Sequence, residues 1–348
     1  MPEMPEMTSA ERVMAVLERR EPDRVPHFEW LIARNVREAL CPGCRGHNDF
    51  AVRMGHDAIL VGPDFAKTPV GETTWRSEWG WVLDYGGEEH GVEVESPIAT
   101  MDDLAGYIPP DPHASGRYAT IAQAIAEHKG KLAVGVHLND VFSIPRSLMG
   151  MENLLMAIAA EPELVTALVD LSVEVNLAEA RHVAALGADF VWTGDDYAGN
   201  DGPFMSPASF RELFWPGLKR VAAGFAELGL PFIKHCDGNI WPIADMMVDS
   251  GIRCLDPIDP AGGMDLAEVK AKFGDRVAVK GNVDCAGVLV SGTEEEVVAA
   301  TIEALRKGMP GGGYICSSSN SIHASVNPEN YRVMMATLRE HGRYPMTI

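Results

Sequence analysis

The chain has 348 residues, of which 46% are hydrophobic and 23% are charged, a composition typical of a globular protein rather than a disordered or fibrous one. Acidic residues outnumber basic ones by 50 to 29, which gives a formal net charge of −21. A surface this negative repels nucleic acid phosphates and anionic lipid headgroups, so we expect neither a nucleic acid nor a membrane as a partner. It also disfavours polyanionic substrates unless arginines line the pocket.

The cysteines and the first residues bear on where the protein works. Four of the six cysteines fall in or beside apolar, strand-like runs, which is typical of a reduced protein, and Cys41-Pro-Gly-Cys44 is expected to be a turn with two thiols. No run approaches the roughly 20 apolar residues of a membrane span. Residues 1–8 have neither the basic start nor the apolar centre of a signal peptide. We therefore expect a cytoplasmic protein.

Apolar, β-branched segments alternate with helical patterns along the chain, after a first amphipathic helix expected at 9–20. Near-continuous apolar strands separated by helices are typical of a parallel sheet covered by helices, and eight such units predict an α/β fold, a (β/α)8 TIM barrel. A doubly wound open sheet is disfavoured because no glycine-rich dinucleotide turn follows the first strand. The expected strands are 24–30, 57–64, 131–138, 189–196, 231–237, 252–256, 276–282 and 313–317.

One segment interrupts this alternation. Residues 74–96 contain three tryptophans, then Gly86-Gly87, then an alternating Val-Glu run, a pattern that predicts a β-hairpin inserted after the second strand. We expect it to decorate the mouth of the barrel, so that residues 1–348 form a single domain.

Polar side chains follow most of the expected strands. In a barrel of this type the reactive groups lie at the C-terminal ends of the strands, so these side chains are expected to converge on one polar pocket. An Asp or Asn after a strand is also often the N-cap of the next helix, and that alternative stays open for Asp256, Asp259 and Asp284. The candidates are His27, Glu29, Asp64, His137, Asn139, Asp196, His235, Asp237, Asn282, Asn320 and His323.

Several motifs carry a resemblance to a known family. They include His235-Cys-Asp-Gly238, Asp256-Pro257, Lys280-Gly-Asn-Val-Asp284 and Glu21-Pro-Asp-Arg-Val-Pro26. With these motifs the chain resembles the uroporphyrinogen decarboxylase superfamily over nearly its whole length. That superfamily contains cofactor-free porphyrinogen decarboxylases and cobalamin-dependent methyltransferases, many of which use zinc.

The sequence favours the methyltransferase branch. The decarboxylases resemble one another in an arginine-rich segment just after the first strand, and residues 29–35 here (Glu-Trp-Leu-Ile-Ala-Arg-Asn) lack it. A substrate with many carboxylates needs several guanidinium partners. Uroporphyrinogen decarboxylase-type decarboxylation therefore remains the alternative function.

The resemblance also implies a metal site. Thiol-directed methyltransferases of the superfamily hold zinc with His-x-Cys and a distant Cys, and this sequence keeps His235 but has Asp237 and, by alignment, Asn320 at the two cysteine positions. His235 and Asp237 are thus expected ligands, with Asn320, Cys316 or His323 as the third. Carboxylate ligands leave a divalent ion more Lewis-acidic than thiolates do, which suits an ether oxygen. Without a metal, Asp237 would orient His235 as a general acid.

Together these features predict an enzyme that takes a methyl group from a small methoxylated substrate, an aromatic ether, and passes it to the cobalt of a separate corrinoid protein. The leaving oxygen needs a Lewis acid or a proton, from His235 with Asp237 or from an acid such as Glu29 or Asp64. The implied cofactors are zinc and the partner's cobalamin, and a homodimer is implied by resemblance alone. A non-catalytic, ligand-binding barrel remains a second alternative. The expected substrate contacts are His27, Trp30, His137, Asn139, Asp196, Asn282, Asn320 and His323, with Trp30, Phe65, Trp75, Trp79 and Trp81 as walls for an aromatic ring.

Overall fold

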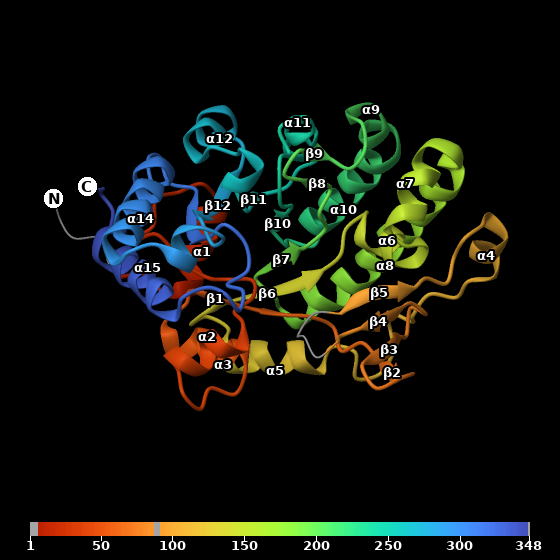
Figure 1. Cartoon of the computed structure of the whole chain (residues 1–348), viewed down its shortest axis with the longest axis horizontal. Coiled ribbons are helices and arrows are strands. Elements are labelled where there is room, and N and C mark those ends of the chain that lie inside the picture. The colour runs from red at the N-terminus through yellow and green to blue at the C-terminus, as the bar shows by residue number, and fades with distance from the viewer. Residues whose placement is uncertain (1–5, 87–90, 347–348) are drawn as a thin grey trace.

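The structure is a computed structural model that describes residues 6–86 and 91–346. Seven parallel strands form one curled sheet with helices on its outer face (Figure 1), which confirms the predicted α/β barrel class. In spatial order the strands are β1 (Ala58–Val61), β6 (Ala133–Leu138), β7 (Phe190–Thr193), β10 (Phe232–His235), β11 (Cys254–Asp256), β12 (Ala278–Val283) and β13 (Tyr314–Ser318).

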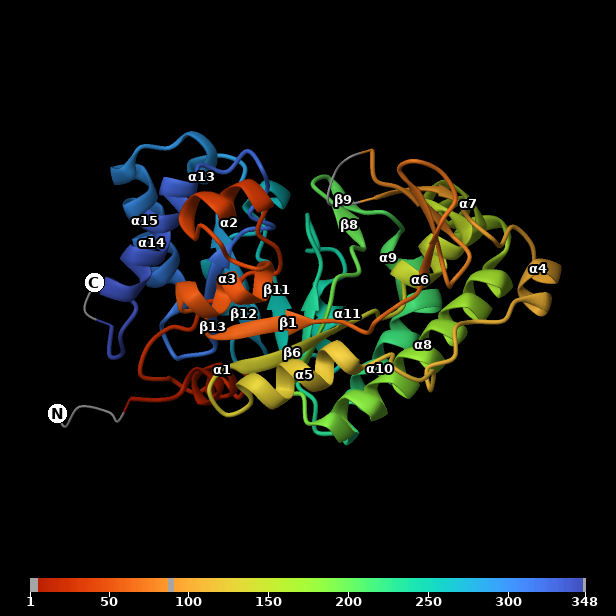
Figure 2. The same cartoon turned by 90° about the horizontal axis from the view of Figure 1, so that it is seen from below.

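Helices join these strands and cover the sheet, as the view from below shows (Figure 2). Their caps follow the sequence: Ser206, Thr293 and Asn327 each accept a backbone N–H at the start of a helix. The helices are α1 (Ser9–Leu17), α2 (Arg34–Leu40), α3 (His47–Met54), α4 (Met101–Gly106), α5 (Ala119–His128), α6 (Ser143–Met149), α7 (Met151–Ala160), α8 (Pro162–Leu186), α9 (Pro207–Ser209), α10 (Trp215–Glu227), α11 (Ala244–Asp249), α12 (Leu266–Phe273), α13 (Val288–Ser291), α14 (Glu294–Gly308) and α15 (Pro328–His341), with a short π-helix η1 (Phe210–Phe214) and a 3-10 helix η2 (Pro260–Gly262).

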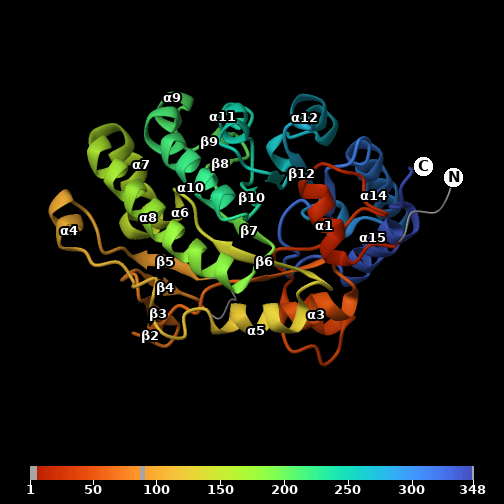
Figure 3. The same ribbon diagram turned by 180° about the vertical axis from the view of Figure 1, so that it is seen from behind.

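A small cluster of buried residues fills the lower half of the barrel. It combines alternate residues of the strands, such as Ala133, Ile233 and Ala278, with the apolar face of α1. Helix α1, seen in front of the strands in Figure 3, therefore closes the N-terminal end of the barrel. Because side chains alternate along a strand, the residues two positions further on point into the upper half of the interior.

The first expected strand, 24–30, is not a strand, which corrects that prediction. The segment 24–33, here called the seam, lies between β13 and β1 and makes isolated bridges at His27 with Cys316 and at Ile32 with Ile322. Pro26 has no N–H to donate. The backbone N–H of His27 instead bonds the Asp57 carboxylate at 2.9 Å. The seam still closes the barrel, and side-chain hydrogen bonds replace part of the backbone hydrogen-bond ladder that a strand would form.

The inserted hairpin is present and larger than expected. It is a four-stranded antiparallel sheet in the order β2 (Lys67–Pro69), β3 (Thr74–Ser77), β4 (Val82–Asp84) and β5 (Val92–Glu95). Gly87 of the predicted turn lies outside the described residues. Arg117 fixes the insertion with two hydrogen bonds to the Glu78 carboxylate, at 2.5 and 3.0 Å.

Two further findings concern the covalent structure and the helices. Cys41 and Cys44 form a disulfide, which corrects the expectation of two thiols, and the other four cysteines are buried and free. Within the described residues, no helix has the length and apolar character that crossing a membrane requires.

Candidate active site

A layer of polar side chains lies in the upper interior of the barrel. His137, Trp192, His235, Asp256 and Lys280 come from five neighbouring strands, each two or four residues beyond an interior apolar residue of its strand. All five are almost fully buried or, for His137, half-buried. The curl of the sheet thus concentrates ionisable groups at the C-terminal ends of the strands, where enzymes of this fold do their chemistry.

His235 stands among three carboxylates. Its Nδ1 is 3.3 Å from Asp256 Oδ2, and its Nε2 is 3.4 Å from Asp237 Oδ1 and 3.6 Å from Asp196 Oδ1. Burial alone would lower the pKa of His235, but Asp237 and Asp256 outweigh it and raise the pKa to about 10. In the metal-free protein this side chain is therefore an imidazolium at neutral pH.

Asp256 holds the ring of His235 in place. Its Oδ2 also accepts the indole N–H of Trp192 at 2.6 Å, and its Oδ1 accepts Lys280 Nζ at 2.8 Å. Despite burial, Lys280 and His235 keep the pKa of Asp256 well below its usual range. Because Asp256 stays ionised, it keeps Nδ1 of His235 protonated. The lone pair of Nε2 is then available to a metal ion, which would take the place of the proton on that nitrogen.

Asp196, His235 and Asp237 form a group that fits a metal ion. One ligand atom from each lies within 4.8 Å of the others. Asp237 Oδ1 is buried and, among the described residues, makes no well-aligned hydrogen bond; its charged neighbour is His235 Nε2 at 3.4 Å, so a metal ion could take the place of the proton between them. The other carboxylate oxygen, Oδ2, accepts the amide of Asn320 at 2.5 Å. Two carboxylates and one imidazole suit a divalent ion such as Zn²⁺.

The third position of this group is filled by Asp196, which the sequence suggested only as a substrate contact. Of the three side chains expected there, Asn320 instead donates to Asp237, and His323 Nε2 lies 3.1 Å from the carbonyl oxygen of Cys285. Cys316 packs in the outer core, behind the sheet. Asp196 is itself fixed by the backbone N–H of Asp237, at 2.9 Å from Oδ1.

Two other predicted residues are engaged away from this group, whereas Asn282 lies on the same face of β12 as Lys280, two residues further on. The carboxylate of Asp64 is exposed and accepts the backbone N–H and hydroxyl of Thr120 at the start of α5. His27 lies with Nδ1 2.9 Å from the carbonyl oxygen of Cys316 and Nε2 3.0 Å from the Tyr331 hydroxyl. Asn282 is half-buried at the end of β12.

Glu29 acts on the site at a distance. Its carboxylate accepts the backbone N–H of Ser318 at 2.9 Å, and the Ser318 hydroxyl, which has one proton to donate, lies within hydrogen-bond distance of both Glu29 Oε2 and the backbone oxygen of Asn320. Burial raises the pKa of Glu29 to about 7, against the lowering effect of Lys280 and Ser318. The seam thus supports the loop whose amide holds Asp237.

A cavity of about 570 Å³ separates the inserted sheet from the barrel mouth. Trp30 stacks on Trp192 with ring centroids 4.4 Å apart, and the ring of Trp192 lies 5.0 Å from that of His235. Burial lowers the pKa of His137 to about 4, so its ring is neutral. An aromatic surface therefore leads from the cavity to the candidate metal ligands. The lining includes all five aromatic residues expected as walls, Trp30, Phe65, Trp75, Trp79 and Trp81, together with Asn139.

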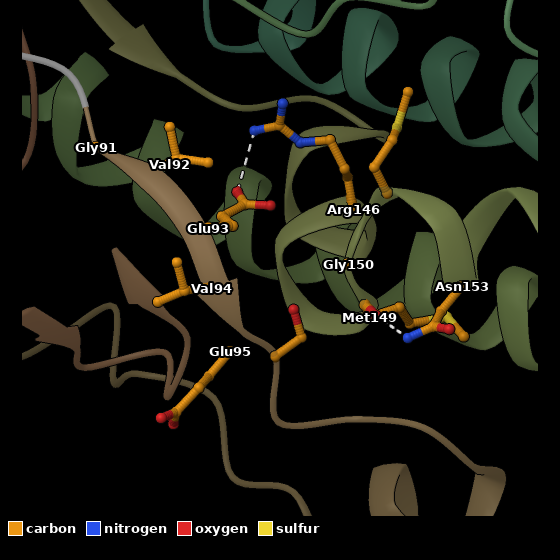
Figure 4. Close-up of a pocket in the computed structure, with 11 residues that line it drawn as sticks. Gly91, Val92, Glu93, Val94, Glu95, Arg146, Met149, Gly150 and Asn153 are labelled. Carbon is orange, nitrogen blue, oxygen red and sulfur yellow. Dashed lines mark hydrogen bonds and ion pairs between the residues drawn. The ribbon is translucent and has the colours of Figure 1, made fainter. Parts of the chain in front are cut away.

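A second cavity, of about 510 Å³, lies on the other side of β5 (Figure 4). Glu93 and Arg146 line both cavities and form an ion pair at 3.2 Å, drawn as a dashed line between β5 and α6. The pair separates the two spaces and connects the inserted sheet to the barrel.

Comparison with known proteins places the chain in a family. It is 24% identical over 277 residues to a uroporphyrinogen decarboxylase of Aromatoleum aromaticum, covering 74% of this chain and 73% of the relative. It is also 24% identical to a methylcobamide:CoM methyltransferase, MtaA, of Methanosarcina barkeri over 97% of this chain and 99% of the relative. A methyltransferase structure from Methanosarcina mazei matches with a TM-score of 0.77 and 19% identity, covering 96% of this chain and 99% of that one, so the folds agree. The uroporphyrinogen decarboxylase (URO-D) family model matches residues 49–341, and the chain belongs to this family.

Proposed function

We propose that this protein is a methyltransferase that demethylates a small aromatic ether and delivers the methyl group to the cobalt of a corrinoid carried by a partner protein. The observation that carries the proposal is the junction of an aromatic cavity with the group of Asp196, His235 and Asp237. The similarity to methyltransferases named for methylcobamide, over nearly the whole chain, supports the reaction class.

The residues of the site have separate tasks. Asp196, His235 and Asp237 would hold a divalent ion, which when bound supplies Lewis acidity at the ether oxygen. Asp256 keeps the ring of His235 oriented, and Asn320 fixes Asp237 through its second oxygen. The tryptophans of the cavity exclude water and stack on the aromatic ring of the substrate.

The proposed reaction breaks the bond between the methyl carbon and the ether oxygen. Both electrons of that bond stay on the oxygen, which becomes a phenol once it takes a proton. The new bond to the methyl carbon takes its electron pair from cobalt in the Co(I) state. An unassisted phenoxide leaves poorly, so a positive group close to the oxygen accelerates the step.

Decarboxylation of a porphyrinogen is the alternative, because curated decarboxylases are among the relatives. A substrate with many carboxylates needs several cationic partners. Among the described residues that line the aromatic cavity, Lys67 and Arg146 are the cationic ones, and Arg146 is already paired with Glu93. A non-catalytic barrel is disfavoured because gathering Asp196, His235 and Asp237 at the mouth of the barrel is costly unless a ligand uses them.

The test uses the purified protein with one equivalent of Zn²⁺, free cob(I)alamin as methyl acceptor and a panel of methoxybenzenes. Loss of the Co(I) absorbance with formation of the phenol supports the proposal, and His235→Gln should abolish both. His323→Gln, at a histidine bonded to the Cys285 carbonyl, serves as the matched control and should retain activity. A panel without any demethylated member, together with decarboxylation of uroporphyrinogen, would replace the proposal by the alternative.

A further inference from the structure

One face of the inserted sheet is turned toward the aromatic cavity. Register pairs Lys67 with Ser77, Trp75 with Leu83 and Leu83 with Glu93, and all five of these residues line the cavity. Arg76, between Trp75 and Ser77 on β3, points the other way and pairs with Glu95. The insertion therefore selects which side chains meet a ligand above the barrel mouth.

Lys67 is the unpaired charge on this face. Its Nζ lies 5.2 Å from the ring centroid of Trp75 and 5.0 Å from that of Tyr85, and it has no carboxylate partner among the described residues. At the opposite edge, Glu93 accepts hydrogen bonds from Arg146 and Ser147 and is neutralised there. Lys67 is on β2 at one edge of the inserted sheet, whereas Arg146 is engaged with Glu93 on β5 at the other edge, so Lys67 is the cation left for a ligand among the described lining residues.

The aromatic rings around Lys67 already hold a cation. A second cation, such as a quaternary ammonium ligand, would compete with Lys67 for the same ring faces. An anion would instead pair with the exposed ammonium group, which the two rings hold beside the cavity. Since the protein carries a net charge of −21, a lysine that lines the cavity without a carboxylate partner among the described residues is a selective feature rather than part of a general attraction for anions.

We propose that the aromatic cavity binds a methoxylated aromatic acid, with the ring between the tryptophans and the carboxylate on Lys67. The inference rests on the proposed function and narrows its substrate class. The methoxy group then faces the other end of the cavity, where Trp30, His137 and Gly194 form the lining next to the barrel interior. Lys67 is a specificity determinant in this arrangement and takes no part in the bond that breaks.

Binding can be measured without cobalt, reductant or a corrinoid protein. Isothermal titration compares 4-methoxybenzoate with its neutral isostere 4-methoxybenzamide and with 4-methoxyphenyl-trimethylammonium, on the full chain. We expect the acid to bind about tenfold more tightly than the amide, as one charge-assisted hydrogen bond implies. Lys67→Met should remove that difference and leave the affinity for the amide unchanged, whereas Lys67→Arg should retain it.

Lys219→Met is the matched control, because Lys219 also lies over a tryptophan ring, 3.9 Å from the centroid of Trp215, but does not line the cavity. It should leave all three affinities unchanged. Equal affinity for acid and amide in the wild type, tighter binding of the ammonium compound, or parallel losses in Lys67→Met would each overturn the inference.

The two proposals fail separately. Lys67-dependent binding of the acid without methyl transfer to cob(I)alamin would leave this inference standing and remove the proposed function. Demethylation of neutral ethers at rates that Lys67→Met does not change would support the proposed function and overturn this inference.

Discussion

The polar layer inside the barrel and the face of the inserted sheet above it are built on opposite principles. In the layer, His235, Asp256 and Lys280 are buried and bonded to one another, so the charges are mutually compensated and their geometry is fixed. On the inserted face, Lys67 and Trp75 stand beside an open cavity, with one charge left for a ligand. The difference indicates that the barrel supplies the chemistry while the insertion selects the substrate.

The strongest way to break this division is to remove the central histidine. His235→Gln takes away one of three candidate metal ligands and with it the Lewis acid proposed for the ether oxygen, so we expect the rate of methyl transfer to fall by about a thousandfold. Bound zinc, measured by mass spectrometry, should fall in parallel, while the affinity for 4-methoxybenzoate changes little. A proportionate loss of ligand affinity would mean that the barrel and the insertion do not act separately.

The pH dependence of the free energy of unfolding tests a buried carboxyl group, Glu179, that interacts with Arg117, the residue that fixes the insertion. Burial, with help from Glu78, raises the pKa of Glu179 to about 7 against the effect of Arg117. The folded state thus favours the protonated form, and the stability that this group contributes below pH 4.5 is lost as the pH rises through 7. We expect Glu179→Gln to increase the free energy of unfolding by up to about 3 kcal/mol at pH 8, and by far less near pH 5.

Urea unfolding at the two pH values measures this difference. Glu174→Gln, at an exposed position of the same helix, is the control and should change neither value. A Glu179→Gln effect of the same size at both pH values would contradict the assignment.

Within the barrel, the orienting role of Asp256 predicts a selective loss of metal affinity. Asp256→Asn keeps the shape but replaces the carboxylate next to Nδ1 of His235, so we expect zinc to bind about 10- to 100-fold more weakly. Asp284→Asn should have little effect, because Asp284 accepts only backbone N–H groups, from Ala286 and Gly287, in the described structure. Competition with a fluorescent chelator measures both variants, and equal affinities would exclude the role.

The smallest effect is expected on the inserted face. Trp75→Ala removes one stacking surface of the cavity, so KM for the aromatic ether should rise about tenfold with kcat nearly unchanged. Trp241→Ala, at a tryptophan outside the cavity, should alter neither parameter. A loss confined to kcat would place Trp75 in the chemical step and would remove the contrast between the two regions.

The sequence predicts the barrel because alternation of strands and helices is a local signal, repeated many times. It does not predict that the first strand becomes a seam, because that outcome depends on the carboxylates of Asp57 and Glu29 accepting backbone N–H groups from other parts of the chain. The hairpin was also visible in the sequence, but its extension to β2 depends on pairing between Lys67 and Ser77.

The residues of the candidate site also divide into those that the sequence predicts and those that it does not. His235 and Asp237 stand out in the sequence through a motif of the superfamily. The sequence does not distinguish a helix cap from a functional group at Asp256, and the contacts of its carboxylate with Trp192 and Lys280 decide that point. The sequence does not single out Trp192 and Lys280, because it does not tell which face of a buried strand turns toward the interior of the barrel. Lys67 was missed because its relevance depends on how the insertion folds over the barrel mouth.

The seam has a consequence for local unfolding. It contributes few ladder hydrogen bonds, so we expect it to open at a lower free energy than the laddered strands, and its amide protons should exchange with solvent before those of β6 and β7. Glu29 in the seam supports Ser318 and hence Asn320, which holds Asp237. Opening of this segment therefore loosens a candidate metal ligand more than 200 residues away in the chain, and added Zn²⁺ should slow deuterium uptake in residues 24–33.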